Sequence, residues 1–306
     1  MKNPKLDRLV FLVKDMDKVL SFFSAKLGLH FLEFDSEAVN KTGVRASVCY
    51  DVNLHFIAPV FPLADNAAPP IKAHAERVQK RDMMVLAFTF FFKNEKELLS
   101  GIEKAGLSII HQYKDDETYH SLGMVHFTEY VLDSRDTFGL SIAFANYKKR
   151  QSVKSSSFIT GLDRFIIMVK DIDEYMRFFQ KNFGFEFQEL DPEIEKRDGI
   201  RSCICWDARL HLIAPRYPLQ DSLPPPMRRK IELLETQDYV VMALTFTVDD
   251  IETARSKLKA AGITVQEHEY KKSNDYASIG LKNFEEIMTY PEDTFDHVIG
   301  FAKYEK

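Results

Sequence analysis

The side chains that could do chemistry in this chain occur in duplicate. Arg8 and Arg164 belong to two LDR segments, and His55 and His211 belong to the segments LHFIAP and LHLIAP, each pair being 156 residues apart. A guanidinium can hold a carboxylate, a phenolate or an enolate, and an imidazole can move a proton near neutral pH. These four residues are therefore the candidate catalytic residues, provided that the fold brings an arginine and a histidine together.

Other polar residues recur with the same or nearly the same spacing. The candidates for substrate binding are the repeated arginines and tyrosines Arg45, Arg201, Tyr113, Tyr119, Tyr270 and Tyr276. For the arginines, a paired or solvated strand residue is the alternative interpretation, and for the tyrosines it is aromatic packing. Glu129 and Glu286 also recur, and we expect them to be exposed charges at a strand edge.

The elements that must position these residues follow from the same repeat. Residues 6–70 and 162–226 are identical at 28 of 65 positions, which indicates a duplication. The first copy is predicted to span residues 1–150 and the second residues 158–306. The polar, serine-rich segment 151–157 is predicted to link them.

Each copy contains a weaker repeat of about half its length. Segments 169–187 and 248–265 both run from an apolar strand through an acidic turn and an amphipathic helix to a glycine and a second strand. The alternating segment 199–215 predicts two hairpin strands with a turn near Asp207 and Ala208. The repeating unit is therefore βαβββ, and the chain contains four of them.

Two proline-rich segments, 59–82 and 215–237, each continue into a basic, helix-like stretch. We expect each to be a crossover that joins the two units of its copy and that could cover the sheet as a lid. The same helices could contact a second copy of the chain, so a homodimer stays open.

Composition and charge exclude several classes of function. The chain has 41 basic and 46 acidic side chains, a net charge of -5 and no basic stripe, which argues against a nucleic-acid partner. No stretch approaches the roughly 18 apolar residues of a membrane span, and charges interrupt the apolar N-terminal segment. We expect a cytoplasmic protein without a membrane partner, in which the three cysteines are buried thiols.

Several of these segments resemble the vicinal oxygen chelate superfamily of glyoxalases, methylmalonyl-CoA epimerases, bleomycin resistance proteins and extradiol dioxygenases. The resemblance covers nearly the whole chain and rests on the openings VKDMD and VKDID, the glycine–x–arginine passages before LHFIAP and LHLIAP, the second opening VDDIE, and the closing DTF segments. It implies an α+β fold in which four βαβββ modules pair into two cupped mixed β-sheets with flanking helices. Four modules in one chain resemble the layout of the two-domain extradiol dioxygenases.

The resemblance also implies a divalent metal inside each cup, with one ligand from each of four strands. Carried over residue by residue, the ligand positions fall on Arg8, His55, Ala87 and Ala143 in the first copy and on Arg164, His211, Ala243 and Gly300 in the second. A guanidinium has no lone pair to donate and repels a cation, and alanine and glycine have no donor. We therefore predict that neither copy binds a metal at this place, and we expect no cofactor.

What remains is a cup with aromatic walls, one cation and one imidazole. We predict a metal-independent enzyme of the lyase, isomerase or hydrolase type, which uses arginine- and histidine-assisted proton transfer on a small aromatic or carboxylated metabolite.

Several alternatives stay open. One is a protein of the bleomycin-resistance kind that sequesters a small molecule, and another is a dioxygenase with shifted ligands, such as His55 with Glu129, His120 or His126. A plainer interpretation pairs Arg8 with Asp7 or Asp51 and makes one copy a scaffold only.

Overall fold

The computed structural model describes residues 3–63, 69–115, 117–149, 155–220, 225–266 and 270–305. Its contacts divide the chain into two compact units: Lys5–Ile159, called the first half, and the chain from Thr160 onward with the N-terminal residues up to Pro4, called the second half. The predicted linker 151–157 adjoins this division, and its residues 151–154 lie outside the described ranges.

The first half contains two βαβββ units in sequence. Its elements are β1 (Lys5–Val13), α1 (Met16–Leu20) with a π-helical continuation (Ser21–Lys26), β2 (Leu32–Glu33), α2 (Ser36–Thr42), β3 (Val44–Cys49), β4 (Leu54–Pro59), α3 (Pro69–Gln79), β5 (Met83–Phe91), α4 (Glu95–Ala105), β6 (Ile109–Asp115), β7 (Met124–Leu132) and β8 (Ile142–Lys149), with 3-10 turns at Thr118–His120 and Ser134–Asp136.

The second half repeats this order. Its elements are β9 (Ile159–Val169), α5 (Ile172–Phe183), β10 (Gln188–Glu189), α6 (Pro192–Asp198), β11 (Ile200–Cys205), β12 (Leu210–Pro215), α7 (Pro225–Leu233), β13 (Tyr239–Val248), α8 (Ile251–Ala260), β14 (Tyr270–Ser273), β15 (Lys282–Met288) and β16 (Val298–Glu305), with 3-10 turns at Ala277–Ile279 and Pro291–Asp293.

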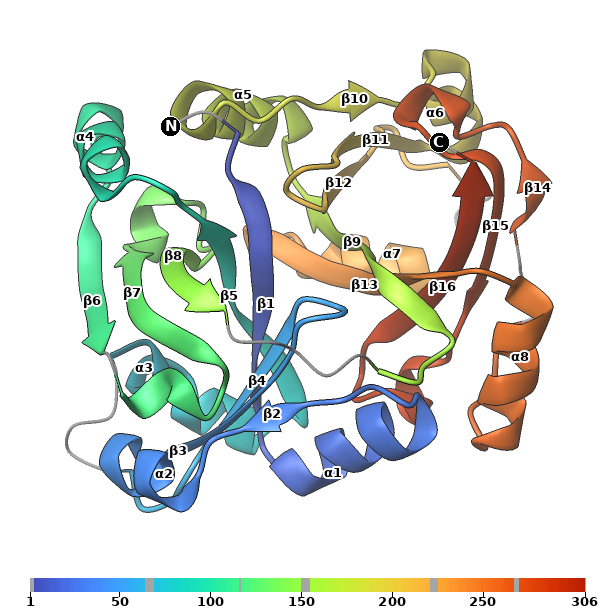
Figure 1. The fold of residues 1–306 in the computed structure, drawn as a ribbon. Helices are drawn as coiled ribbons and strands as arrows, with labels where there is room; N and C mark the ends of the chain where they lie inside the picture. Colours follow the sequence, from blue (N-terminus) through green and yellow to red (C-terminus); the bar gives the residue numbers. More distant parts are fainter. Residues whose placement is uncertain are drawn as a thin grey trace. The chain divides into compact units, whose positions relative to one another are not determined.

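Each half forms one curled, mixed sheet of eight strands (Figure 1). The strand order is β2-β3-β4-β1-β5-β8-β7-β6 in the first half and β10-β11-β12-β9-β13-β16-β15-β14 in the second. In the first half β1 and β5 are antiparallel neighbours at the centre, and each pairs in parallel with the last strand of its own unit, β4 or β8. The predicted α+β fold of paired βαβββ modules is confirmed, including the hairpin between β11 and β12.

The acidic turns and the glycines of the repeat fix the helix ends. The side chain of Asp171 caps α5 by accepting hydrogen bonds from the backbone amides of Asp173 and Glu174, and Asp250 caps α8 through the amide of Thr253. Helix α5 ends at Gly184, whose φ of 71° is the left-handed conformation that glycine adopts without a steric penalty. The sequence therefore determines where α5 begins and ends and where α8 begins.

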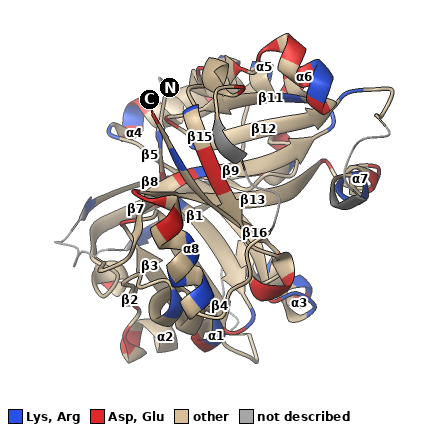
Figure 2. Ribbon diagram, turned by 90° about the vertical axis from the view of Figure 1, so that its right-hand side faces the viewer, with Lys and Arg blue, Asp and Glu red and all other residues tan. Residues whose placement is uncertain are grey.

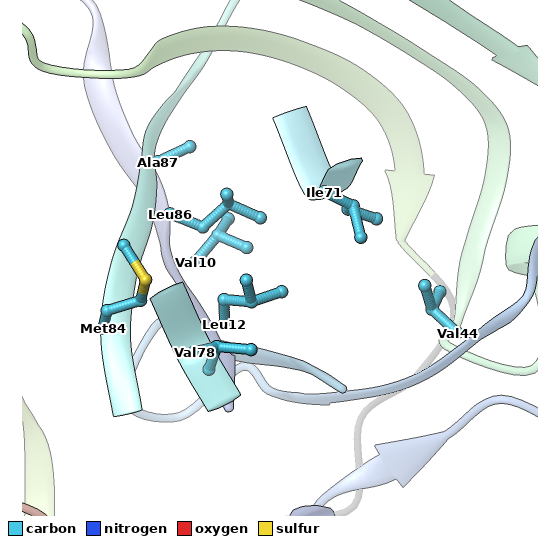
Figure 3. Packing of buried hydrophobic residues seen from close by; sticks show 8 residues of the cluster. All are labelled: Val10, Leu12, Val44, Ile71, Val78, Met84, Leu86 and Ala87. Carbon is cyan, nitrogen blue, oxygen red and sulfur yellow. The ribbon is translucent and has the colours of Figure 1, made fainter. Parts of the chain in front are cut away.

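Helix α3 packs on the central strands of the first half. Figure 3 shows Ile71 and Val78 of this helix together with Val10 and Leu12 of β1 and apolar residues of β5. The second half has an equivalent cluster beneath α7. The proline-rich crossovers thus continue into helices, as predicted, and α3 contributes to the wall of the cup.

Charged residues are concentrated on the helices, such as α6 and α8, whereas the strands are mostly uncharged (Figure 2). Among the described residues no helix is long and apolar enough to cross a membrane. The three cysteines are unpaired and buried, as predicted. Buried charges on the strands include Arg8, Asp163, Arg164 and Glu286, and they mark the candidate site.

Candidate functional site

Arg8 is the centre of a polar cluster inside the cup of the first half. Its side chain is 2% exposed, and its Nε donates to Nδ1 of His55 on β4 at 3.2 Å. Its Nη2 donates to Oε1 of Glu129 on β7 at 2.8 Å, and its Nη1 pairs with Asp7. One guanidinium therefore connects three strands and both βαβββ units of the half.

The hydrogen bond from Arg8 fixes the tautomer of His55. Arginine has only donors, so Nδ1 of His55 must be the acceptor, and the neutral ring then carries its proton on Nε2. Burial, followed by the charge of Arg8, lowers the pKa of His55 well below its usual value, so the ring stays neutral. Its Nε2 is buried and has no hydrogen-bond partner among the described residues.

Glu129 is a largely buried acid, which corrects our expectation of an exposed charge. Its side chain is 12% exposed, and that of its counterpart Glu286 is 5% exposed. Oε1 of Glu129 accepts from Arg8 and, at 3.3 Å, from Thr89 of β5. Burial raises the pKa of the Glu129 carboxyl, although the charge of Arg8 opposes this shift.

A sequence signal for the buried glutamate existed. Side chains two residues apart on a strand share a face, and Glu129 alternates with Phe127 and Val131 on β7. In the second half Glu286 alternates in the same way with Phe284 and Met288 on β15. An acid between two apolar residues of the same face indicates that it points inward.

The polar cluster forms part of the wall of a cavity of about 400 Å³ in the first half. Its aromatic lining comes from Phe34, Tyr113, Tyr119 and Phe127, its aliphatic lining includes Val10, Val44, Ala46, Ile57 and Ile71, and its polar lining includes Arg8, His55, Thr89, Glu129, Lys41 and Lys114. A volume of this size suits a small organic molecule.

The second half repeats the cluster, but the hydrogen bonds of its histidine differ. Arg164 pairs with Asp163 and donates to Oε1 of Glu286 at 3.0 Å. However, Nε2 of His211 lies 2.6 Å from the Ser202 hydroxyl, while Nδ1 of His211 and Nε of Arg164 have no partner among the described residues. Burial, followed by the charge of Arg164, lowers the pKa of His211 to about 3.

The structure places the other predicted residues in different surroundings. Tyr113 and Tyr119 line the cavity of the first half. Arg45 lies between the lining residues Val44 and Ala46 on β3, so it points to the opposite face of the sheet, where its Nη2 donates to Asp17 at 2.7 Å. The structure therefore does not bring Arg45 together with the cluster.

Three candidates belong to the second half. Arg201 pairs with Asp173 at 2.7 and 2.9 Å on the half-exposed face of β11. Tyr276 packs edge-on against Phe284 and donates to Asp198 at 3.2 Å. The backbone of Tyr270 belongs to β14, but its side chain lies outside the described part of the structure.

The residues at the family's metal positions do not fit a divalent ion. Ala87 and Ala143 line the cavity but offer no donor atom. The lone pairs that His55 Nδ1 and Glu129 Oε1 could give to a metal are directed at the guanidinium of Arg8. Across the described ranges no group of three His, Cys, Asp or Glu residues could hold a metal ion, with His120 and His126 included in the search.

In the second half the space beside Gly300 is occupied by a side chain. A Cβ at Gly300 would lie 2.7 Å from Oε1 of Glu286, so this carboxylate of β15 already occupies the space beside the glycine. The position that would supply a ligand from the last strand is therefore taken by the partner of Arg164.

Comparison with known proteins agrees with this architecture. Residues 161–282 match the sequence model of the Glyoxalase/Bleomycin resistance protein/Dioxygenase superfamily. No curated protein matches the chain.

Solved structures share the fold over almost the whole chain. A mutant of 4-hydroxymandelate synthase from Streptomyces coelicolor is 13% identical with a TM-score of 0.61, over 99% of this chain and 94% of that one. A Mn(II)-bound glyoxalase from Novosphingobium aromaticivorans is 10% identical with a TM-score of 0.60, over 99% and 83% of the two chains. The halotolerant catechol dioxygenase BphC is 12% identical with a TM-score of 0.60, over 98% and 86%. At these identities the likeness concerns the fold alone.

Proposed function

The chain is a two-domain member of the vicinal oxygen chelate superfamily, and on that premise we propose that its first half is a metal-independent enzyme that moves a proton on a small carbonyl compound. The observation that carries the proposal is the buried group of Arg8, His55 and Glu129 in the wall of a cavity of about 400 Å³. Arg8 stands at a position where the resemblance places a metal ligand, and its guanidinium bonds to both an imidazole and a carboxylate.

The proposed reaction is proton abstraction from the carbon next to a carbonyl group. Glu129 is the base: its Oε1 is held by Arg8 and Thr89, while Oε2 has no hydrogen-bond partner among the described residues. The C–H bond breaks, the proton goes to the glutamate, and the electron pair passes into an enolate. Because burial raises the pKa of Glu129, the carboxylate is a stronger base than one in water.

His55 stabilises the enolate oxygen as a neutral hydrogen-bond donor. With Nδ1 occupied by Arg8, the ring can offer only the proton on Nε2, so it acts as an electrophile and not as the general base. Arg8 is a positioning residue in this scheme, since it fixes the histidine tautomer and holds the glutamate. Return of the proton from Glu129 to another carbon of the enolate completes an isomerisation, whereas its return to the original carbon regenerates the substrate.

The lining of the cavity favours an aromatic or otherwise apolar substrate over one that places a carboxylate beside Arg8, His55 and Glu129. Arg8 already faces two carboxylates, Asp7 and Glu129. A third negative charge beside them would be repelled and poorly solvated. We therefore place the carbonyl group of the substrate beside His55 and Glu129, and its ring against the aromatic wall formed by Phe34, Tyr119 and Phe127.

Deuterium exchange tests the proposal without knowledge of the natural substrate. 2-Indanone is a small aromatic ketone with enolisable C–H bonds, and the protein in D₂O is expected to accelerate its deuteration as followed by proton NMR. Glu129→Gln keeps the size of the side chain but removes the base, so the acceleration should fall by about 100-fold or more. The matched control is Glu286→Gln, which makes the same change in the second half and should retain the exchange.

Two results would reject the proposed enzyme. Binding of 2-indanone without accelerated exchange would indicate a sequestering protein of the bleomycin-resistance kind. Equal exchange in the wild type and in Glu129→Gln would remove the glutamate from the mechanism.

A further inference from the structure

One difference between the two halves changes the hydrogen bonding of the histidine. Ala46 on β3 and Ser202 on β11 are equivalent in the repeat and have the same register, because Ala46 pairs with Ile57 and Ser202 with Ile213. In the second half the Ser202 hydroxyl lies 2.6 Å from Nε2 of His211. In the first half alanine provides no hydroxyl, and Nε2 of His55 is left without a partner among the described residues.

A buried Nε2–H of His55 without a hydrogen-bond partner destabilises the folded protein unless a ligand bonds to it. His55 is 4% exposed, and a buried N–H group without an acceptor loses its hydrogen bond to water and gains nothing in return. Ala46 lines the cavity together with His55, so space for an acceptor lies on the cavity side of this alanine. The second half shows which atom satisfies the same ring position, namely a neutral oxygen.

We propose, building on the function proposed above, that the substrate of the first half is a neutral ketone or related carbonyl compound whose oxygen binds Nε2 of His55 beside Ala46, where the Ser202 hydroxyl stands in the second half. Ser202 is thus an internal substitute for the substrate oxygen, and Nε2 of His211 has a hydrogen-bond partner without a ligand. The substrate-binding site is therefore the cavity of the first half.

The oxygen must be neutral and must accept a hydrogen bond. The tautomer of His55 requires an acceptor, since Nδ1 already receives the Nε–H of Arg8. A carboxylate would add a negative charge close to Glu129 and Asp7, which share a single arginine. A ketone oxygen meets both requirements, and the negative charge that develops on it during enolisation is met by the Nε2–H.

Two substitutions test this inference. Ala46→Ser introduces into the first half the hydroxyl that bonds to Nε2 of the histidine in the second half, and Ser202→Ala makes the opposite change as the matched control. Dissociation constants are measured by NMR titration for 2-indanone and for indane, which has the same ring system without the oxygen.

The wild type should bind 2-indanone about fivefold more tightly than indane, which corresponds to one net hydrogen bond. Ala46→Ser should bring this ratio to about one, and Ser202→Ala should leave it at about five. In ring-labelled protein, 2-indanone should shift the Nε2 resonance of His55, and Nδ1 should have the chemical shift of an unprotonated nitrogen.

An unchanged ratio in Ala46→Ser, equal affinity of the wild type for the two compounds including no binding of either, or a protonated Nδ1 would overturn the inference. These outcomes are separate from the exchange experiment. A protein that prefers the ketone but does not deuterate it would keep this binding site and lose the proposed reaction.

Discussion

Replacing His211 by glutamine is expected to remove part of the loss of stability that the wild type suffers in mild acid. The pKa of His211 is about 3 in the folded protein, while the unfolded chain has the ordinary histidine value of 6.5. Below pH 6.5 the unfolded state therefore binds a proton that the folded state does not, and the stability of the fold decreases as the pH falls. Each pH unit below 6.5 costs about 1.4 kcal/mol, so this one residue costs about 2 kcal/mol between pH 7 and pH 5.

Comparison of the wild type with two histidine variants isolates the contribution of His211 to the pH dependence of stability. Glu129 and Glu286 have raised pKa values and act in the opposite direction, because the folded state gains their protons more readily as the pH falls. Urea unfolding is measured at pH 7 and at pH 5 for the wild type, for His211→Gln and for the control His30→Gln, which changes an exposed histidine. His211→Gln should lose about 2 kcal/mol less than the wild type on acidification, and the control should follow the wild type. Parallel losses in the wild type and in His211→Gln would refute a neutral, buried His211.

Two further predictions concern the packing around Gly300 and the independence of the proposed reaction from metal ions. Gly300→Ala places a methyl group 2.7 Å from Glu286 Oε1 and 2.8 Å from Thr245 Oγ1, and should lower the free energy of unfolding by about 1 to 3 kcal/mol. The equivalent position of the first half already carries a methyl group, that of Ala143. Equal stability of the wild type and Gly300→Ala in urea would contradict the close packing at Gly300. Dialysis against EDTA should leave the deuteration of 2-indanone unchanged, whereas a loss that Mn²⁺ or Fe²⁺ restores would show that a metal takes part.

The fold could be predicted because its information is local and repeated. The acidic turn before α5 and Gly184 after it define that helix, and the same signals recur in the other units. The duplication then supplies the pairing of the modules, since one module alone cannot bury its apolar face.

The site could be predicted only in part, because its contacts join strands that are far apart in the sequence. The pair of Arg8 and Asp7 was among the expected alternatives, but Asp51 instead accepts from the backbone amide of Ser155 at 2.7 Å. The bond from Arg8 to Glu129 spans 121 positions and depends on the register of β7. Which nitrogen of His55 has no protein partner, and hence the proposal that the ring donates a hydrogen bond and is not the base, depends on the direction of the Arg8 side chain.

The link that Arg8 makes between three strands also bears on how such a site can arise. The guanidinium and the imidazole come from the first βαβββ unit of the half, and the carboxylate comes from the second. Neither unit holds the complete set, so neither could have been selected for this chemistry while it stood alone. A copy of one unit would have carried only part of this group, whereas a copy of a pair of units carries all of it, and the stronger of the two repeats in the sequence has the size of a pair.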